Sequence, residues 1–376
     1  MQRDPHIVFI QNHGIFVAAD TTEEIDHWYA EVKDTLQNAF DDFPVFREKG
    51  VSEKLTEVLP AIRMVLSGEK LKVATAFNST AIESFITSKE AFREGISRPF
   101  TPDQMVYCLS EYLFIENSGT TGEIIEEVRT KTGEFISRRG VPPKVIFVQG
   151  EGAVVAEDSA VSVGYLRDIV NDFCQISNYS ENFGGPHPLT GEQAAFIESW
   201  EVENYRKKVS LGSQARGRVE NKSIVVTGAA QGFGAGIAEI LYQEGANIVV
   251  ADLNEEKGKA FADSLNSGGR KNRAVFIPVN VSEAASVGKM VHQAVLEFGG
   301  LDVMISNAGI LRAGSLDEMD QETFELMTKV NYTGYFLCAK YAKPVMRLQH
   351  EINPGHFMDI IQINSKSGLK GSNKNF

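Results

Sequence analysis

Runs of apolar residues separated by polar turns predict a βαβ unit between Ser223 and Asn254. A buried strand over 224–226 leads into a glycine-rich turn, a helix and a second apolar strand that ends at Asp252. Glycines at 228, 232 and 234 let the backbone turn tightly and leave room for a pyrophosphate on the helix N-terminus. This order predicts a doubly wound α/β sheet of the nucleotide-binding type in the second half of the chain.

The acidic end of the second strand indicates which dinucleotide would bind. Asp252 follows the turn by about twenty residues, where a carboxylate can accept both hydroxyls of an adenosine ribose and would repel a 2′-phosphate. The next residue is Leu253, and no Arg or Lys stands close by in sequence to bind that phosphate. We therefore expect NAD rather than NADP.

The first 44 residues show a different pattern, which predicts strand, turn, strand and helix. Two apolar runs within residues 7–19 flank Asn12-His13-Gly14, a typical hairpin turn. A capping sequence at 21–24 then precedes apolar residues spaced for one buried helix face: Ile25, Trp28, Val32 and Leu36. Because a globular domain does not normally begin in mid-sheet, we expect the natural domain to start upstream of Met1.

The same pattern returns further along the chain. Residues 7–37 align without a gap with residues 145–175, an offset of 138 positions. Nine pairs are identical, at positions 9, 11, 14, 17, 18, 20, 32, 34 and 37 of the first copy. Two explanations stay open, a true repeat and chance convergence on one strand-turn-strand-helix pattern. The turn becomes Gly150-Glu151-Gly152, so the second copy lacks the histidine, and Glu151 is either a functional carboxylate or a solvated turn residue.

The stretch around the second copy predicts one α/β domain over about 60–190. Strand-like and helix-like runs alternate there, and residues 123–140 resemble a charged, exposed helix. Residues 191–220 predict a connecting helix followed by a polar linker, with the domain boundary between about 205 and 221.

Composition narrows the class of protein. A chain of 376 residues has room for two or three domains, and a net charge of −13 argues against a broad surface for nucleic acid or anionic lipid. The three cysteines are far apart, which suggests neither disulfides nor a thiolate metal site. No secretion signal or membrane-spanning apolar run is apparent, so the expected location is the cytoplasm.

From Lys222 onward a series of motifs resembles the short-chain dehydrogenase/reductase family over about 155 residues. The turn has the TGxxxGxG form of that family, and five further positions or motifs follow in order. The matched positions are Thr227, Gly228, Gln231, Gly232, Phe233 and Gly234 in the turn, Asp252 and Leu253, Asn280 and Val281, Asn307-Ala308-Gly309, Asn331 and Ser365.

The resemblance implies a role for each motif. Asn307-Ala308-Gly309 would leave room for the adenine ribose and the nicotinamide, and Asn280 with Val281 would flank the adenine. The family more often has Asp at position 280, but an amide oxygen can still meet the adenine amino group. Asn331 would hold a water that leads toward the catalytic lysine, and Ser365 would bond the substrate oxygen. Taken alone, Asn331 could equally be a capping or core amide, and Ser365 a turn serine.

The family's proton-transfer motif, Tyr-x-x-x-Lys, would begin near position 378, and the chain ends at Phe376. We therefore expect this chain to be the middle of a longer polypeptide, truncated at both ends. We expect it to bind NAD weakly at best and to turn over no substrate by itself. The incomplete sheet would leave an unpaired edge.

The run from Val8 to Glu24 resembles the last third of a class II aldolase/adducin domain. That resemblance implies that His13 is a zinc ligand, with two more from an upstream His-x-His. The sequence contains no His-x-His, so zinc is expected only in an intact aldolase domain. In this interpretation residues 1–44 are the end of one such domain, and 60–190 form a second aldolase-like region.

The combination resembles the bifunctional rhamnulose-1-phosphate aldolase/alcohol dehydrogenases. It implies an NAD-dependent dehydrogenase for a small sugar-derived alcohol or carbonyl compound in carbohydrate catabolism. Expected partners are a small-molecule substrate and further copies of the intact protein, without nucleic acid or membrane. One alternative is a sugar alcohol or sugar alcohol phosphate dehydrogenase with a non-catalytic N-terminal region. Another is a non-catalytic assembly module.

Overall fold

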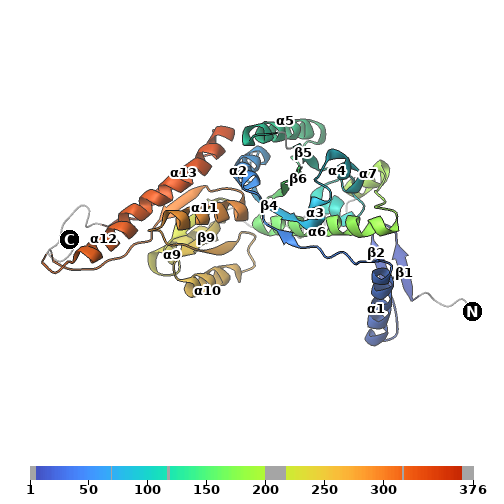
Figure 1. The fold of residues 1–376 in the computed structure, drawn as a ribbon, viewed down its shortest axis with the longest axis horizontal. Helices are drawn as coiled ribbons and strands as arrows, with labels where there is room; N and C mark the ends of the chain where they lie inside the picture. The colour runs from blue at the N-terminus through green and yellow to red at the C-terminus, as the bar shows by residue number, and fades with distance from the viewer. Residues whose placement is uncertain (1–5, 69, 117–118, 200–216, 316, 366–376) are drawn as a thin grey trace, which may run out of the picture.

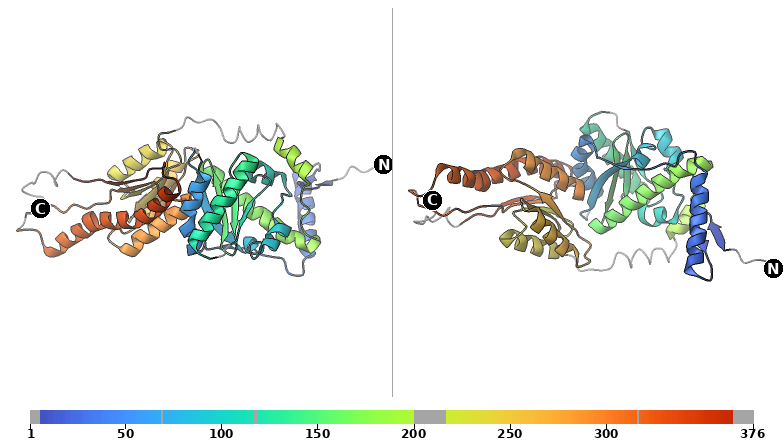
Figure 2. Two further views of the ribbon diagram at one scale, coloured as in Figure 1. Left: turned by 90° about the horizontal axis from the view of Figure 1, so that it is seen from above. Right: turned by 60° about the horizontal axis from the view of Figure 1, so that its bottom comes forward.

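The computed structural model describes residues 6–365, apart from 69, 117–118, 200–216 and 316. These residues form three sheets, which lie in three successive units along the molecule (Figures 1 and 2). The hairpin unit lies at the N-terminal end, a middle α/β unit follows, and a C-terminal α/β unit completes the described chain. Much of the predicted linker lies outside the described residues.

The C-terminal unit is a parallel five-stranded sheet in the order β10-β9-β8-β11-β12. Its strands are β8 (Ser223–Thr227), β9 (Asn247–Asp252), β10 (Ala274–Pro278), β11 (Val303–Ser306) and β12 (Asp359–Gln362). The helices are α9 (Gly232–Gln243), α10 (Glu255–Asn266), α11 (Ala284–Phe298), α12 (Gln321–Thr328) and α13 (Gly334–Ile352). This confirms the predicted doubly wound parallel sheet.

Alternating residues of the C-terminal strands bury both faces of this sheet. Ile224 and Val226 share one apolar cluster with residues of α9 and α10, whereas Val225 belongs to a second cluster with α11 and α13. Continuous apolar strands are expected where helices cover both faces. At the edge of the sheet, all four residues of β12 are exposed.

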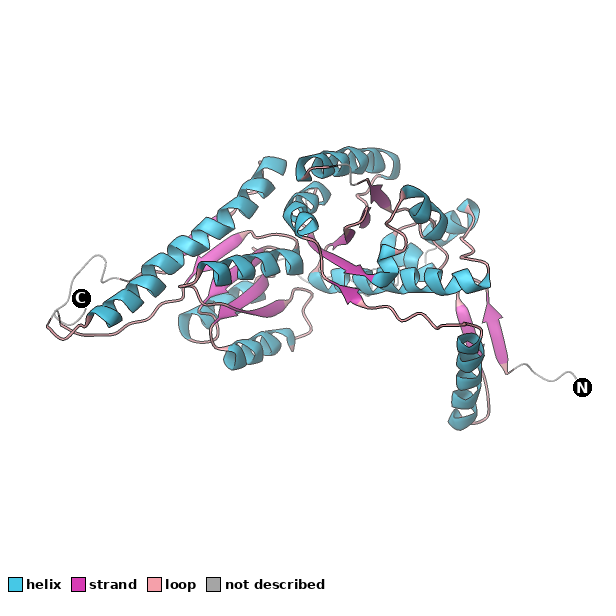
Figure 3. Ribbon diagram, viewed as in Figure 1, coloured by secondary structure: helices cyan, strands magenta, loops and turns pink. Residues whose placement is uncertain are grey.

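The middle unit is a mixed sheet in the order β3-β4-β7-β6-β5 with helices on both faces (Figure 3). Its strands are β3 (Glu48–Lys49), β4 (Val73–Ser79), β5 (Leu113–Ile115), β6 (Val145–Val148) and β7 (Gly152–Glu157). The larger helices are α2 (Glu53–Leu66), α5 (Thr121–Arg139) and α6 (Ala160–Ser180). Shorter helical segments are α3 (Thr80–Glu83), α4 (Lys89–Gly95), η1 (Gln104–Cys108), η2 (Glu181–Phe183) and α7 (Gly191–Ser199).

One expectation for the middle unit was right for only one side of a helix. The helix predicted to be charged and exposed, α5, buries an apolar side, with Ile124, Val128 and Phe135 at 1% exposure or less. These side chains pack with α2 and one face of the sheet. The many charges occupy the opposite side of the helix, so the average composition concealed its amphipathic spacing.

The hairpin unit consists of β1 (Ile7–Ile10), β2 (Gly14–Val17) and α1 (Thr22–Asn38). Thr21 caps the helix by accepting a hydrogen bond from the backbone N–H of Glu24. The predicted buried face is only half-buried, because α1 has no fully buried residue and Leu36 is 47% exposed. In the described chain the hairpin stands as a two-stranded sheet by itself, which leaves too little surface to cover the helix.

The two sequence copies have the same strand register. β1 pairs with β2 through Ile7↔Val17 and Ile10↔Gly14, and β6 pairs with β7 through Val145↔Val155 and Val148↔Gly152. The turns also correspond, with φ near 59° at Asn12 and 71° at Gly150, and both are followed two positions later by a positive-φ glycine. The two units therefore fold alike across the whole aligned hairpin.

No helix among the described residues has the length and apolar character needed to cross a membrane.

Candidate nucleotide-binding site

The glycine turn between β8 and α9 has the close contacts and the open space that a dinucleotide requires. Gly228 and Gly232 have φ of +66° and +63°, in the left-handed region that favours glycine. A Cβ atom on Gly228 would lie 2.8 Å from Cα of Ala308, whereas a Cβ on Gly232 would meet no heavy atom within 4 Å. At Gly228 the turn is therefore in close contact with the segment that follows β11, and at Gly232 it is open.

The N-terminus of α9 faces this open space without a side-chain cap. Gln231 is the N-cap residue but makes no capping hydrogen bond. Free N–H groups and the positive end of the helix dipole are a good site for a pyrophosphate. Phe233, in the first turn, is 86% exposed. The residues present therefore fit the phosphates of a dinucleotide.

Asp252 lies beside the turn, as the sequence predicted. Its Oδ2 accepts a hydrogen bond from the backbone N–H of Ala230 at 2.9 Å, and its Oδ1 accepts one from Asn254 at 2.9 Å. Each oxygen keeps further acceptor capacity toward a ribose. Leu253 is 76% exposed and offers no charge.

Sequence reasoning missed a cation beside the glycine turn. Lys257 donates from Nζ to Oε1 of Gln231 at 2.9 Å, so the first turn of α10 brings an ammonium group beside the glycine turn. The signal was its place on α10: the N-cap Asn254 accepts a hydrogen bond from the backbone N–H of Lys257.

Asn307 and Ala308 join the end of β11 to the end of β8. Their backbone N–H groups donate to Oγ1 of Thr227 at 3.0 and 3.1 Å, and Nδ2 of Asn307 donates to the Thr227 carbonyl at 2.9 Å. The strand order reverses between these two strands, and ligands of open α/β sheets bind at that crevice. The predicted turn and the predicted Asn-Ala-Gly motif therefore meet in one place.

Asn331 lies on a π-helical turn, η3 (Lys329–Thr333), between α12 and α13. Its amide both accepts from the N–H of Ile310 and donates to the carbonyl of Ile310, each at 2.8 Å. A Cβ on Gly309 would lie 3.3 Å from Oδ1 of Asn331. Asn331 therefore fixes the segment that follows the Asn-Ala-Gly motif.

Asn280 makes local hydrogen bonds just after the end of β10. Its Oδ1 accepts from the N–H and the hydroxyl of Ser282, and its Nδ2 donates to Glu283 at 2.7 Å. Asn readily forms such local turns with residues two positions ahead. Its neighbour Val281 is 7% exposed and packs against Gly334.

Ser365 is exposed and follows β12 at the same edge of the sheet as the other motifs. Its backbone N–H donates to Oδ1 of Asn364 at 2.8 Å. Gly368, the next residue of the family pattern, lies outside the described residues.

Among the residues that the structure describes, none joins His13 in a group that could hold a metal ion. Its ring is exposed and stacks with Phe16 at a centroid distance of 6.3 Å. Within the described ranges, no group of three or more His, Cys, Asp or Glu residues could hold a metal ion. The neighbouring Asn12 instead donates to the carbonyls of Phe100 and His187, each at 2.8 Å, and so ties the turn to the middle unit.

Glu151, the counterpart of His13, is not the solvated residue of the simpler interpretation. Its side chain is 13% exposed, and Nζ of Lys54 lies 3.8 Å from Oε1. The strands that flank this turn, β6 and β7, are inner strands of the five-stranded sheet, so the turn has more neighbours than the turn between β1 and β2.

The buried cysteines are poor nucleophiles. Burial raises the pKa of Cys108 to about 12 and the pKa of Cys338 to about 11, although a hydrogen bond with Ser306 partly offsets the effect at Cys338. A thiol that stays protonated near neutral pH is not activated for covalent chemistry.

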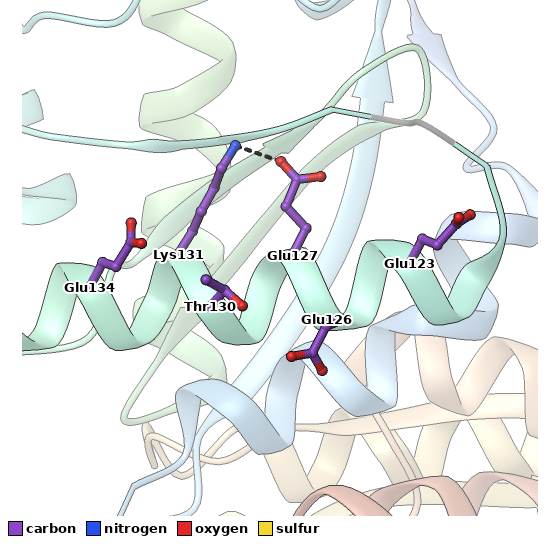
Figure 4. Close-up of a pocket in the computed structure, with 6 residues that line it drawn as sticks. All are labelled: Glu123, Glu126, Glu127, Thr130, Lys131 and Glu134. Atoms are coloured by element: carbon purple, nitrogen blue, oxygen red, sulfur yellow. Dashed lines mark ion pairs between the residues drawn. The ribbon is translucent and has the colours of Figure 1, made fainter.

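A shallow hollow elsewhere on the surface has a different character. All six lining residues belong to α5 (Figure 4): Glu123, Glu126, Glu127, Thr130, Lys131 and Glu134. Lys131 already pairs with Glu127. A strip on one helix brings no groups together from separate elements, and we assign it no ligand.

Comparison with known proteins agrees with this geometry. Residues 222–375 match the short chain dehydrogenase family. The chain is 36% identical over 163 residues to a trans-4-hydroxycyclohexanecarboxylate dehydrogenase of Sinomonas cyclohexanicum, which covers 42% of this chain and 60% of that protein. It is 36% identical over 154 residues to a 2,5-dichloro-2,5-cyclohexadiene-1,4-diol dehydrogenase of Sphingobium indicum, covering 41% and 58%. The C-terminal region is therefore a short-chain dehydrogenase domain.

A longer match includes the other units. The uncharacterized oxidoreductase YuxG of Bacillus subtilis is 23% identical over 379 residues, covering 92% of this chain and 55% of that protein. A crystal structure of a short-chain dehydrogenase of the glucose/ribitol dehydrogenase type from Brucella melitensis is 31% identical and covers 43% of this chain and 64% of that one, with a TM-score of 0.37. The chain spans about 55 to 60% of the length of these three curated relatives.

Proposed function

We propose that the C-terminal domain binds NAD and that the protein uses it to oxidise or reduce a small sugar-derived alcohol or carbonyl compound. The observation that carries this proposal is the Asp252 carboxylate, held beside the open glycine turn by the N–H of Ala230. Paired hydrogen bonds from two ribose hydroxyls would use the acceptor capacity that this carboxylate keeps.

The preference for NAD over NADP rests on charge. A carboxylate at this position repels a 2′-phosphate, whereas Lys257 lies near enough to the turn to weaken that repulsion. Asp252 is directly attached to the turn through Ala230, and Lys257 reaches it only through the Gln231 side chain. We therefore expect a preference for NAD that is real but moderate.

The residues of this chain would divide the work as follows. The turn and the N-terminus of α9 would bind the pyrophosphate, and the Thr227–Asn307 hydrogen bonds would keep the two strand ends together. Asn331 would hold the backbone beside the nicotinamide end through Ile310, and the Ser365 hydroxyl would bind the substrate oxygen. Bound NAD supplies hydride transfer.

The substrate class is inferred from the relatives and from the resemblance to aldolase/dehydrogenase proteins described above. The two named dehydrogenases act, by their names, on hydroxylated six-membered rings. Small polyhydroxylated sugars share their secondary alcohol groups. We therefore favour a sugar-derived alcohol, and a sugar alcohol phosphate is the alternative within the same chemistry.

We also infer that the hairpin unit and the matching part of the middle unit are related to class II aldolases. The shared strand register supports a common origin of these two parts of the chain. Their relation to class II aldolases rests on the resemblance of residues 8–24 to that family. A zinc-dependent activity would need ligands besides His13.

Titration of NAD and NADP into the chain by isothermal calorimetry tests the proposal. Asp252→Ala should weaken NAD binding about 10- to 100-fold, the range for losing hydrogen bonds to a charged group, and should narrow the difference between NAD and NADP. Asp263→Asn, an exposed carboxylate on α10, is the matched control and should change nothing. Equal NAD affinity for the parent and Asp252→Ala would refute the assignment.

A further inference from the structure

A fully buried carboxylate lies where the middle and C-terminal units meet. Asp302 stands directly before β11 and is 0% exposed. Its two oxygens lie within hydrogen-bond distance of four other residues of the chain. The donors are Nη1 and Nη2 of Arg63 at 3.2 and 2.8 Å, the N–H of Ser223 at 2.7 Å and Nε2 of Gln349 at 3.1 Å, while Nε2 of His356 lies 2.8 Å away.

Arg63 comes from the other unit. It lies on α2, 239 positions earlier in the chain, and it is also 0% exposed. Beyond its two contacts with Asp302, it donates from Nε to the carbonyl of Lys72 at 2.7 Å and from Nη2 to the carbonyl of Asn221 at 3.0 Å. Neither charge reaches water, and the carboxylate that pairs with Arg63 belongs to the other unit.

The Asp302 carboxyl stays ionised in this setting. Burial by itself would raise its pKa, but the Arg63 charge and hydrogen bonds from His356 and Arg63 outweigh burial and hold the pKa well below its usual range. The pair is therefore charged on both sides of the interface near neutral pH.

The backbones of the two units also approach closely. A Cβ atom on Gly299 would lie 2.7 Å from Cβ of Ala74, and a Cβ on Gly300 would lie 3.0 Å from Nη1 of Arg63. Oγ1 of Thr75 donates to the carbonyl of Leu296 at 2.8 Å. The segment between α11 and β11 is therefore in close contact with α2 and β4 of the middle unit, and its two glycines leave no space for a Cβ atom.

Asn221 adds a second link at the same place. Its Nδ2 donates to the carbonyls of Leu71 at 2.9 Å and Asp158 at 2.8 Å, and its own carbonyl accepts from Arg63. Asn221 comes just before β8, so the starts of both central strands, β8 and β11, are held by the middle unit.

This interface lies at the amino ends of the strands, whereas the proposed nucleotide site lies at their carboxyl ends. Asp302 precedes β11 and Asn307 follows it. One four-residue strand therefore connects the contact with Arg63 to the Asn307-Ala308-Gly309 segment beside the glycine turn. β11 pairs with β8 on one side and β12 on the other, so we expect a change at one end of this strand to alter the position of its other end.

We propose that Arg63 is a positioning residue for the dinucleotide site: it holds the start of β11, so that the middle unit sets the position of Asn307-Ala308-Gly309. The middle unit is then a platform on which the dehydrogenase domain depends. The effect on cofactor affinity rests on the proposed function, whereas the effect on β11 does not.

The test compares Arg63→Met and Arg63→Lys with Arg167→Met as control. Arg167 is an exposed arginine of the same unit, 40% exposed and paired with Glu48. Two readouts are used: amide hydrogen exchange of residues 303–309, compared with residues 145–157, and the Kd for NAD. Arg63→Met should speed exchange in 303–309 at least about 10-fold more than in 145–157 and raise the Kd on the order of 10-fold.

Arg63→Lys keeps the charge but not the forked geometry, so it should restore part of both losses. Arg167→Met should match the parent. A folded Arg63→Met with parental exchange in 303–309 and parental Kd would overturn the proposal. If Arg63→Met does not fold, parental values in both readouts for Arg63→Lys and for Asp302→Asn would overturn it instead.

The two proposals fail in distinguishable ways. If the parent chain binds no NAD, the proposed function fails, and the exchange data still decide whether Arg63 holds β11. If the parent binds NAD and Arg63→Met binds it equally well, only the positioning role fails.

Discussion

The hairpin unit and its counterpart in the middle unit have one local structure and two opposite environments. Their strands pair in the same register, and their turns have the same signs of φ. Yet Phe9 is 67% exposed, and Phe147 at the matching position is 0% exposed. Phe16 is 56% exposed, and its counterpart Val154 is 0% exposed.

The difference comes from the neighbours of each hairpin. In the middle unit β4 pairs antiparallel with β7, β5 pairs parallel with β6, and helices cover both faces. In the part of the chain that the structure describes, β1 and β2 have only each other. Local sequence therefore determines register and turn, whereas burial, and with it the free energy of folding, depends on the surrounding elements.

Truncation of the matching phenylalanines should show the largest difference in stability between the two hairpins. Phe147→Ala removes a buried ring from the core and should lower the free energy of unfolding by about 3–5 kcal/mol. Phe9→Ala should change it by less than about 0.5 kcal/mol, as for other exposed positions. Urea unfolding followed by circular dichroism measures both. Equal losses would mean that the first hairpin is covered by a partner in solution.

Substitution of the matching turn glycines should give a smaller difference in the free energy of unfolding. Gly14 and Gly152 have φ of +150° and +145°, so alanine strains both turns alike. A Cβ on Gly152 would lie 2.7 Å from the Phe77 carbonyl oxygen, whereas one on Gly14 would meet nothing within 4 Å. Gly152→Ala should therefore cost about 1–3 kcal/mol more than Gly14→Ala, the cost of overpacking, in the same unfolding assay. A difference near zero would show that burial does not distinguish the two turns.

Sequence alone predicted the features that depend on short spacing. The glycine turn, Asp252 beside it and the Asn-Ala-Gly motif at the end of β11 were all expected, because each follows directly from a strand end. The π-helical turn at Asn331 was not predicted, because the sequence analysis gave this residue a role only by resemblance.

Contacts between distant segments could not be predicted in this way. Arg63 and Asp302 lie in different units, and nothing in the spacing of either residue indicates its partner. Lys257 was missed because it lies five positions after Asp252 in sequence, and only the first turn of α10 brings its ammonium group to Gln231. Asn280 was assigned by resemblance, while its local partners Ser282 and Glu283 engage its amide.

A dinucleotide that binds at the carboxyl ends of the C-terminal strands should protect the backbone around the glycine turn. Amide hydrogen exchange of the chain, with and without saturating NAD, measures this protection. We expect slower exchange in residues 227–234 and 305–310 and no change in the hairpins at 7–17 and 145–157. Unchanged exchange at the glycine turn, or protection confined to either hairpin, would show that NAD does not bind there.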